Sequence, residues 1–319
     1  MIRLSTDGGG VLLRKRLKFS DDSTRGQSTV SNVRPEYFVV TYVINPWMDP
    51  KSWARQHQEL ASASRQEWSA LHHNLLDLGA AIELLPPVHG LPDLVFTANA
   101  AIVLDRKVLL AQFRHPERQR EEPHFEAAFR SLHARGLVDV VRRLPEGLVL
   151  EGTGDCLWDS ARNLFWMGYG PRSDHAARYA VEDTFAAEVI SLELAESRFY
   201  HIDTALCALP GGEVMYFPGA FMASARAKIR DRVAPSHRIE LTVEDACRLS
   251  ANAVAIENAV VVSRCSRYLR AKIAERGYRV LENPLPSFRR SGGAAFCLTL
   301  RLDGRSAMMS RDVNEAAVA

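Results

Sequence analysis

The chain has 319 residues, 47% of them hydrophobic, which is enough to bury a large core in one α/β domain or two smaller ones. Its 40 Lys and Arg side chains nearly balance 38 Asp and Glu side chains, so no overall field attracts nucleic acid or an anionic membrane. No apolar run approaches the roughly 20 residues that cross a bilayer, which argues against a membrane-spanning helix.

The N-terminal stretch, residues 1–34, differs in composition from the rest of the chain. It holds three consecutive glycines at Gly8–Gly10, a basic cluster at Arg14–Arg16 and a stretch rich in Ser, Thr and Asp. Such a segment buries too little apolar surface to offset the entropy lost on ordering it, and it lacks the apolar core of a signal peptide. We expect a flexible extension over residues 1–34 and a single folded domain over residues 35–319, beginning near Pro35.

A helix followed by a glycine, a short β-rich run and a proline-marked turn recurs along the chain. The copies are residues 70–87, 125–145 and 269–284. Glycine just past a helix supplies the left-handed residue that ends it, and proline prevents the helix from continuing. The recurrence therefore predicts one structural unit used several times.

Hairpins are predicted between these copies. Paired apolar runs flank short polar turns at residues 101–110, 206–216 and 254–262, and a helix is expected at residues 243–249. Together they indicate a hairpin-plus-helix unit of roughly 50–60 residues, repeated within one domain. The alternative is an ordinary α/β domain in which the similarity between copies is a coincidence.

The cysteines point to a reducing compartment and to one candidate nucleophile. There are five of them, widely spread and without a CxxC pair, which is typical of reduced thiols in the cytoplasm rather than of disulfides or a zinc site. The predicted location is therefore cytoplasmic. Cys297 follows the glycine pair Gly292-Gly293, where the backbone can approach a ligand closely. The alternative is that Cys297 is a small buried hydrophobic residue.

Three further segments place polar side chains beside apolar runs. On a strand, residues two apart face one side, so His201 and Asp203 would project together as a proton carrier and a carboxylate; otherwise they are the outward face of a half-exposed strand. Glu151 opens a glycine-rich turn without the neighbouring ligands of a metal site, so no metal is expected. Asp93 and Asn99 have apolar neighbours and must find partners or bind something.

Five motifs in this order resemble the guanidino-modifying enzymes, which include arginine deiminases, dimethylargininases, amidinotransferases and arginine or succinylarginine dihydrolases. The resemblance covers about residues 37–302. It rests on Asp-x-x-Phe-x-x-Asn at residues 93–99, Glu-Gly-Thr-Gly-Asp at 151–155, Gly-Pro-Arg at 170–172, His-x-Asp at 201–203 and Gly-Gly…Cys-x-Thr at 292–299. The implied fold is α/β: a pentein-type α/β propeller of five ββαβ-like units with pseudo-fivefold symmetry, and a catalytic centre where the units meet.

The same resemblance implies a reaction. Cys297 would attack the central guanidino carbon, and His201 would protonate the departing nitrogen and then activate water against the covalent thiouronium. Glu151 would lie beside His201 and bind the guanidino nitrogens. Asp203 and Asn99 would be further partners of the guanidino nitrogens, because a cation with five N–H donors is recognised by acceptors.

The resemblance also implies how the rest of the substrate is held. Arg118, in an expected hairpin, and Arg172 would bind the carboxylate of an amino acid, Asp93 would take its α-amino group, and Phe96 is a further candidate binding residue. No cofactor is implied. The expected partner is a small guanidino or ureido amino acid, with no nucleic acid and no membrane, and the sequence leaves a homo-oligomer open.

Asn99 favours one branch of this superfamily. Deiminases and dimethylargininases have a carboxylate there, and dimethylargininases usually have another acid at Ala98, whereas Thr-Ala-Asn-Ala resembles the arginine dihydrolases, which release ornithine, ammonia and carbon dioxide. An amide both donates and accepts, so Asn99 would keep a neutral ureido intermediate bound for a second round. Dimethylargininase, arginine deiminase, citrulline hydrolase and amidinotransferase activities remain alternatives. Outside this chemistry, the alternatives are a metalloenzyme and a ribosome-binding protein of the same fold.

Overall fold

The computed structural model describes residues 27–307, which form an α/β protein with five three-stranded sheets. In every sheet the first two strands are antiparallel and the last two are parallel. In this order of pairing, the strands are β15 (Leu300–Arg301), β1 (Thr29–Val33) and β2 (Ala81–Leu85); β3 (Ala101–Leu104), β4 (Lys107–Leu110) and β5 (Val140–Arg142); β6 (Cys156–Asp159), β7 (Leu164–Tyr169) and β8 (Glu188–Glu193); β9 (Leu206–Ala208), β10 (Val214–Tyr216) and β11 (Arg238–Glu240); and β12 (Val254–Ile256), β13 (Ala259–Val262) and β14 (Arg279–Glu282).

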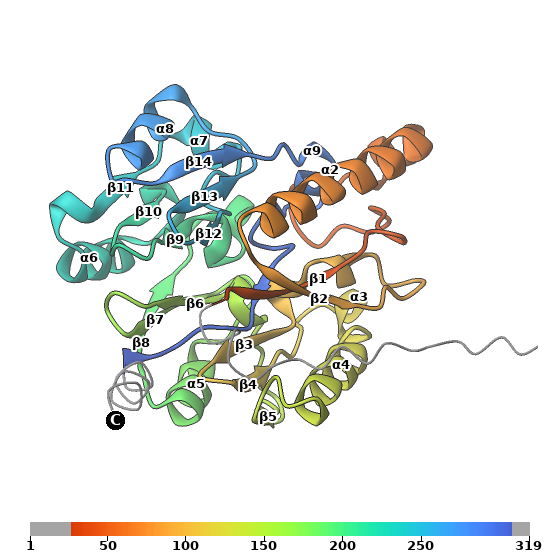
Figure 1. Ribbon diagram of the computed structural model, residues 1–319, viewed down its shortest axis with the longest axis horizontal. Coiled ribbons are helices and arrows are strands. Elements are labelled where there is room, and N and C mark those ends of the chain that lie inside the picture. The colour runs from red at the N-terminus through yellow and green to blue at the C-terminus, as the bar shows by residue number, and fades with distance from the viewer. Residues whose placement is uncertain (1–26, 308–319) are drawn as a thin grey trace, which may run out of the picture.

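A helix joins the two parallel strands of each sheet, as a parallel pair requires a crossover connection. Figure 1 shows these helices on the outside of the molecule and the sheets towards its middle. The five crossover helices are α2 (His57–Asp77), α4 (Glu122–Ala134), α5 (Arg178–Phe185), α6 (Ala223–Arg232) and α8 (Arg267–Ala274); the shorter ones are α1 (Pro50–Arg55), α3 (Pro116–Gln119), α7 (Val243–Cys247) and α9 (Pro286–Arg289).

The local signals in the sequence explain where these elements begin and end. Helices α2, α4 and α8 are each followed by a glycine with a positive φ: Gly79 at 84°, Gly136 at 73° and Gly277 at 86°. Glycine adopts this conformation without strain, so the predicted stops are confirmed. The three predicted hairpins are also confirmed, as β3–β4, β9–β10 and β12–β13.

The predicted start of the folded part near Pro35 is wrong, because β1 lies inside the predicted extension. It is the middle strand of its sheet, with Val30 and Val33 buried. The strand has only two large apolar residues, and the polar composition around it hid them. Residues 1–26 of the predicted extension and residues 308–319 of the predicted domain lie outside the described residues. Within residues 27–307, no helix is long and apolar enough to cross a membrane.

Five linkers connect the sheets, each running from the last strand of one sheet to the first strand of the next. They are residues 86–100, 143–155, 194–205, 241–253 and 283–299. The linkers meet although they are far apart in sequence: the N–H of Ala98 donates to the carbonyl of Cys297, and the N–H of Phe296 donates to the carbonyl of Asn252. Polar side chains on the linkers are thereby brought to one place.

Candidate active site

The nine residues predicted for the site lie in the interior, each at most 4% exposed. Seven of them are on the linkers. The other two are the arginines: Arg118 is on the short helix α3 rather than in the expected hairpin, and Arg172 follows β7. The nine are Asp93, Phe96, Asn99, Arg118, Glu151, Arg172, His201, Asp203 and Cys297.

The thiol of Cys297 lies between an acceptor and a donor. It donates to Oδ2 of Asp203 over 3.0 Å, and Nδ2 of Asn252 donates to the sulfur over 3.0 Å. Burial raises the pKa of Cys297 above its usual value, and the Asp203 carboxylate raises it further, against the hydrogen bonds from Ala294 and Asn252. An added positive charge beside the sulfur, such as a guanidinium, would therefore favour the thiolate.

His201 and Glu151 form a buried pair. Nε2 of His201 is 2.7 Å from Oε2 of Glu151 and donates to it, since a carboxylate can only accept. Although burial raises the pKa of Glu151, Arg172 (2.8 Å away) and His201 together hold that pKa below its usual range, so Glu151 is ionised. Nδ1 of His201 is buried and has no partner among the described residues. It is therefore the atom from which the imidazole can exchange a proton with a ligand.

Asp203 also has one oxygen to spare. Oδ2 accepts from Cys297, whereas Oδ1 is buried without a hydrogen-bond partner in the described part of the chain. Burial raises the pKa of Asp203 to about 7. Asp203 and His201 do not share a strand, as the sequence had suggested: His201 has extended backbone, and Asp203 is in the tight 3-10 turn Ile202–Thr204 that follows.

Arg118 fixes the orientation of Asn99. Nη1 of Arg118 donates to Oδ1 of Asn99 over 2.7 Å, so the amide presents its Nδ2 on the other side, where one N–H donates to the carbonyl of Glu151 over 3.4 Å. A Cβ added at Gly154 would meet that Nδ2 at 2.2 Å and Nδ1 of His201 at 3.2 Å. The absence of a side chain at Gly154 thus leaves room for the amide nitrogen of Asn99 and the ring nitrogen of His201 next to the same backbone position.

Three further residues of this cluster were not predicted for the site, although one of them, Asp155, ends the motif at residues 151–155. Glu121 binds Arg118 through both carboxylate oxygens, and burial raises the pKa of Glu121 to about 7 although Arg118 lowers it. Asp155 lies 3.9 Å from Nε2 of His201, and burial raises its pKa to about 6. Asn252 contacts the nucleophile directly. Glu121 and Asn252 belong to no motif, and their contacts in the structure assign them to the cluster.

Asp93 and Arg172 are both tied to the segment before α1. Tyr42 donates to Oδ2 of Asp93 over 2.9 Å, and Nη2 of Arg172 donates to the carbonyl of Ile44 over 2.9 Å. The guanidinium of Arg172 also lies 4.5 Å from the ring centre of Tyr200. Burial raises the pKa of Asp93, against the effect of Arg118. The segment around Tyr42 and Ile44 therefore covers the candidate site.

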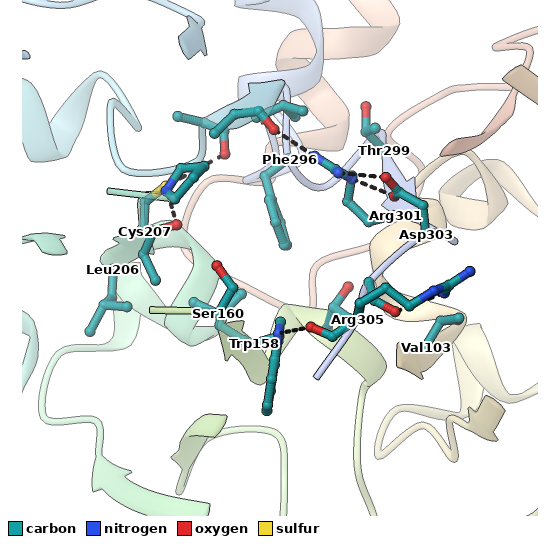
Figure 2. Close-up of a pocket in the computed structure, with 18 residues that line it drawn as sticks. Val103, Trp158, Ser160, Leu206, Cys207, Phe296, Thr299, Arg301, Asp303 and Arg305 are labelled. Atoms are coloured by element: carbon teal, nitrogen blue, oxygen red, sulfur yellow. Dashed lines mark hydrogen bonds and ion pairs between the residues drawn. The ribbon is translucent and has the colours of Figure 1, made fainter. Parts of the chain in front are cut away.

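A separate cavity of about 370 Å³ is lined in part by Phe296, the residue before Cys297 (Figure 2). Figure 2 shows the ring of Phe296 pointing into it, with Trp158 and Arg301 on its wall. None of the nine predicted residues lines it, so the candidate chemistry is not in this cavity. Residues 27–307 also contain no group of three or more His, Cys, Asp and Glu side chains that could hold a metal ion.

Comparison with known families and proteins gives three kinds of match. The family model described as "N,N dimethylarginine dimethylhydrolase, eukaryotic" matches residues 34–302. The bifunctional arginine dihydrolase/ornithine cyclodeaminase ArgZ of Synechocystis is 40% identical over 268 residues, which are 84% of this chain and 37% of that protein. The chain thus spans little more than a third of the length of ArgZ.

Two further matches cover nearly whole proteins or domains. The N(G),N(G)-dimethylarginine dimethylaminohydrolase of Mycobacterium tuberculosis is 33% identical over 84% of this chain and 83% of its own length. The crystal structure of the N-terminal domain of ArgZ, as a substrate-bound mutant, superposes with a TM-score of 0.80 at 37% identity, over 88% of this chain and 99% of that domain.

Proposed function

Because the chain belongs to the dimethylarginine dimethylaminohydrolase family of guanidino-modifying enzymes, we propose that it hydrolyses C–N bonds of a guanidino amino acid through a covalent bond to Cys297. The favoured activity is that of an arginine dihydrolase, which converts arginine to ornithine, two ammonia molecules and carbon dioxide. The observation that carries this proposal is the amide of Asn99, whose nitrogen and not its oxygen is turned towards His201.

The first round removes one guanidino nitrogen. The sulfur of Cys297 forms a bond to the guanidino carbon, one C–N bond breaks, and His201 donates the proton with which ammonia leaves. His201 then takes a proton from water, whose oxygen attacks the thiouronium carbon, and the C–S bond breaks to give a ureido group. The unpartnered oxygen of Asp203 is a suitable acceptor for a guanidino N–H throughout.

The second round repeats these steps on the ureido group. A second ammonia leaves, water hydrolyses the resulting thiocarbamate, and the carbamate loses carbon dioxide to leave ornithine. The ureido group must stay bound between rounds, and it is neutral with a carbonyl oxygen. Asn99 can donate Nδ2–H to that oxygen because Arg118 already occupies its Oδ1.

The remaining predicted residues would hold the amino-acid end. Arg118 and Arg172 would bind the carboxylate, and Asp93 would bind the α-ammonium. Phe96 supports the nucleophile loop: a Cβ at Gly293 would meet the Phe96 ring at 2.5 Å and Cβ of Cys297 at 3.2 Å. Arg172 also forms an ion pair with Glu151, the carboxylate that accepts from His201. Binding of the substrate carboxylate to Arg172 would therefore affect the charge on the group next to His201.

The arrangement of the units is part of the proposal. Five sheets with the same pairing order, joined by linkers that meet, support a pentein-type propeller with pseudo-fivefold symmetry. Its units together would form one catalytic domain that needs no cofactor and no metal. The substrate would reach the centre by movement of the segment around Tyr42 and Ile44.

A second candidate is the hydrolysis of methylated arginines. The matching family model and the relative from Mycobacterium tuberculosis favour it. It requires one round only and leaves a ureido product, citrulline, so retention of a ureido oxygen by Asn99 would serve no further step. We therefore place it second.

A panel of arginine, citrulline and methylated arginines, with identification of every product, tests the proposal. The expected result is close to two ammonia molecules and one ornithine per arginine consumed, and no turnover by Cys297→Ser, which keeps the shape of the side chain but loses the thiol. Citrulline accumulating with one ammonia per arginine would indicate a deiminase. Faster release of methylamines would indicate a dimethylargininase.

A further inference from the structure

Four of the five linkers carry residues of the proposed reaction, and the remaining one, residues 241–253 between β11 and β12, carried no motif. Its last polar residue is Asn252, two residues before β12 begins at Val254. Asn99 has the equivalent place, two residues before β3 begins at Ala101. The repeated topology therefore brings an asparagine to the centre twice, as Asn99 and as Asn252.

Asn252 is fully buried, and its amide contacts the nucleophile loop from two sides. Its Oδ1 accepts from the backbone N–H of Ala294 over 3.0 Å and of Cys297 over 3.1 Å. Its Nδ2 donates to the sulfur of Cys297 over 3.0 Å and to the carbonyl of Asp203 over 3.3 Å. Two acceptor sites and two donor N–H groups are the whole capacity of an amide, and all four are occupied.

These contacts fix which way the amide points. Two N–H groups face one end of it, so that end must be the oxygen, and the nitrogen must face the sulfur. The sulfur consequently has a neutral donor in Asn252 as well as an acceptor in Asp203. Among residues 27–307, no other side chain donates a hydrogen bond to that sulfur.

We propose that Asn252 stabilises the thiolate of Cys297 and positions it for attack. When the S–H bond breaks, the proton moves to Oδ2 of Asp203, which already accepts it, and the electron pair stays on the sulfur. The Nδ2–H of Asn252 then becomes a hydrogen bond to an anion, which is stronger than one to a neutral thiol. The inference rests on the proposed role of Cys297 as nucleophile, but not on which guanidino compound is the substrate.

The titratable neighbours of the thiol offer it no positive charge. Asp203 and Tyr200 are the titratable groups that interact with Cys297, and neither carries a positive charge. Burial and Asp203 raise the pKa of the thiol. The hydrogen bond from the neutral Asn252 amide lowers the thiol pKa and so opposes both effects. A lysine or arginine in its place would form an ion pair with Asp203, whereas the amide leaves that carboxylate available to the substrate.

The test is Asn252→Asp, which separates positioning from stabilisation. The new carboxylate can still accept from Ala294 and Cys297, so the loop keeps its shape, but it turns an acceptor towards the sulfur. The thiolate of Cys297 is titrated by its ultraviolet absorbance without substrate, using Cys297→Ser as the blank. The expected result is a rise of at least about one pH unit in the thiol pKa, equivalent to about tenfold less thiolate at a given pH.

Asn283→Asp is the matched control, because Asn283 is equally buried but bonds Asn74 and Glu67 instead of the nucleophile loop. It should leave the thiol pKa unchanged. If the carboxylate at position 252 prevents folding, Asn252→Ser is measured in its place and should also raise the pKa. An unchanged thiol pKa in a folded variant at this position would overturn the proposal, whatever happens to turnover of arginine.

Discussion

Asn99 is the residue on which the choice between one and two hydrolysis steps depends. Its oxygen is held by Arg118, so its nitrogen is offered to the site. In Asn99→Asp, one carboxylate oxygen would still accept from Arg118, but the other would face the ureido oxygen with a second negative acceptor. Losing a hydrogen bond and gaining this repulsion should cost about 2–3 kcal/mol, or a factor of roughly 30–150 in retention.

The expected consequence is that citrulline escapes. Ammonia released per arginine consumed should fall from near two in the wild-type protein to near one in Asn99→Asp, with citrulline replacing ornithine. The two products are quantified by chromatography in the same sample. A variant that still gives two ammonia molecules per arginine would show that another group retains the intermediate.

Asp203 should make the folded protein more stable at low pH. Its pKa in the folded protein is about 7, raised by burial from its usual 3.8. A raised carboxyl pKa means that the stabilising contribution is complete below about pH 4 and is lost as the pH rises to about 7. Asp203→Asn removes the free-energy cost of ionising this buried carboxyl group. The stability advantage of the variant over wild type should therefore be larger at pH 8 than at pH 5, by at least about 1 kcal/mol.

Urea denaturation at the two pH values measures this difference. Asp183→Asn is the control, because the Asp183 side chain is 80% exposed and pairs only with the exposed Arg142 among its described ion-pair partners. An equal advantage for Asp203→Asn at pH 5 and pH 8 would mean that Asp203 is already ionised in the folded protein at the lower pH.

At the scale of the elements, β1 is the feature on which sequence and structure differ most. Within residues 27–307, it is the only strand that pairs with β2 and with β15. Asn32 at its end also donates to the carbonyl of Leu298, next to the nucleophile, over 2.6 Å. The strand thus connects the N-terminal region to the loop that carries Cys297.

Truncation tests this connection. A chain that begins at Gln27 keeps every described contact and should retain activity, whereas one that begins at Arg34 loses β1. The shorter chain should melt at least ~10 °C lower or fail to fold, because a three-stranded sheet loses its middle strand. Thermal unfolding followed by circular dichroism makes the comparison. Equal melting temperatures would mean that β1 contributes little to the fold.

Local elements were predictable because their signals are local. The glycine stops at Gly79, Gly136 and Gly277 and the three hairpins depend on neighbouring residues only, and the structure contains them. The place of Arg118 was not predictable in the same way: the segment could turn as a hairpin or as a short helix, and the buried partner Glu121 favours the helix.

At the scale of the whole molecule, the meeting of the linkers was implied only by the family resemblance. Nothing in the segments around Glu151, His201 and Cys297 indicates by itself that they touch. Residues without a motif, such as Asn252 and Tyr42, were missed because their roles come from contacts across 45 and 51 positions of sequence. Comparing the five linkers with one another, strand start by strand start, would have pointed to Asn252.

The most direct measurement of the central claim is the mass of the protein after a rapidly quenched reaction with arginine. The account predicts an adduct of arginine minus one ammonia on the peptide that contains Cys297, accumulating further in His201→Ala, where hydrolysis of the thiouronium is slowed. An adduct on Cys156, Cys207, Cys247 or Cys265, or arginine turnover by Cys297→Ser, would contradict it.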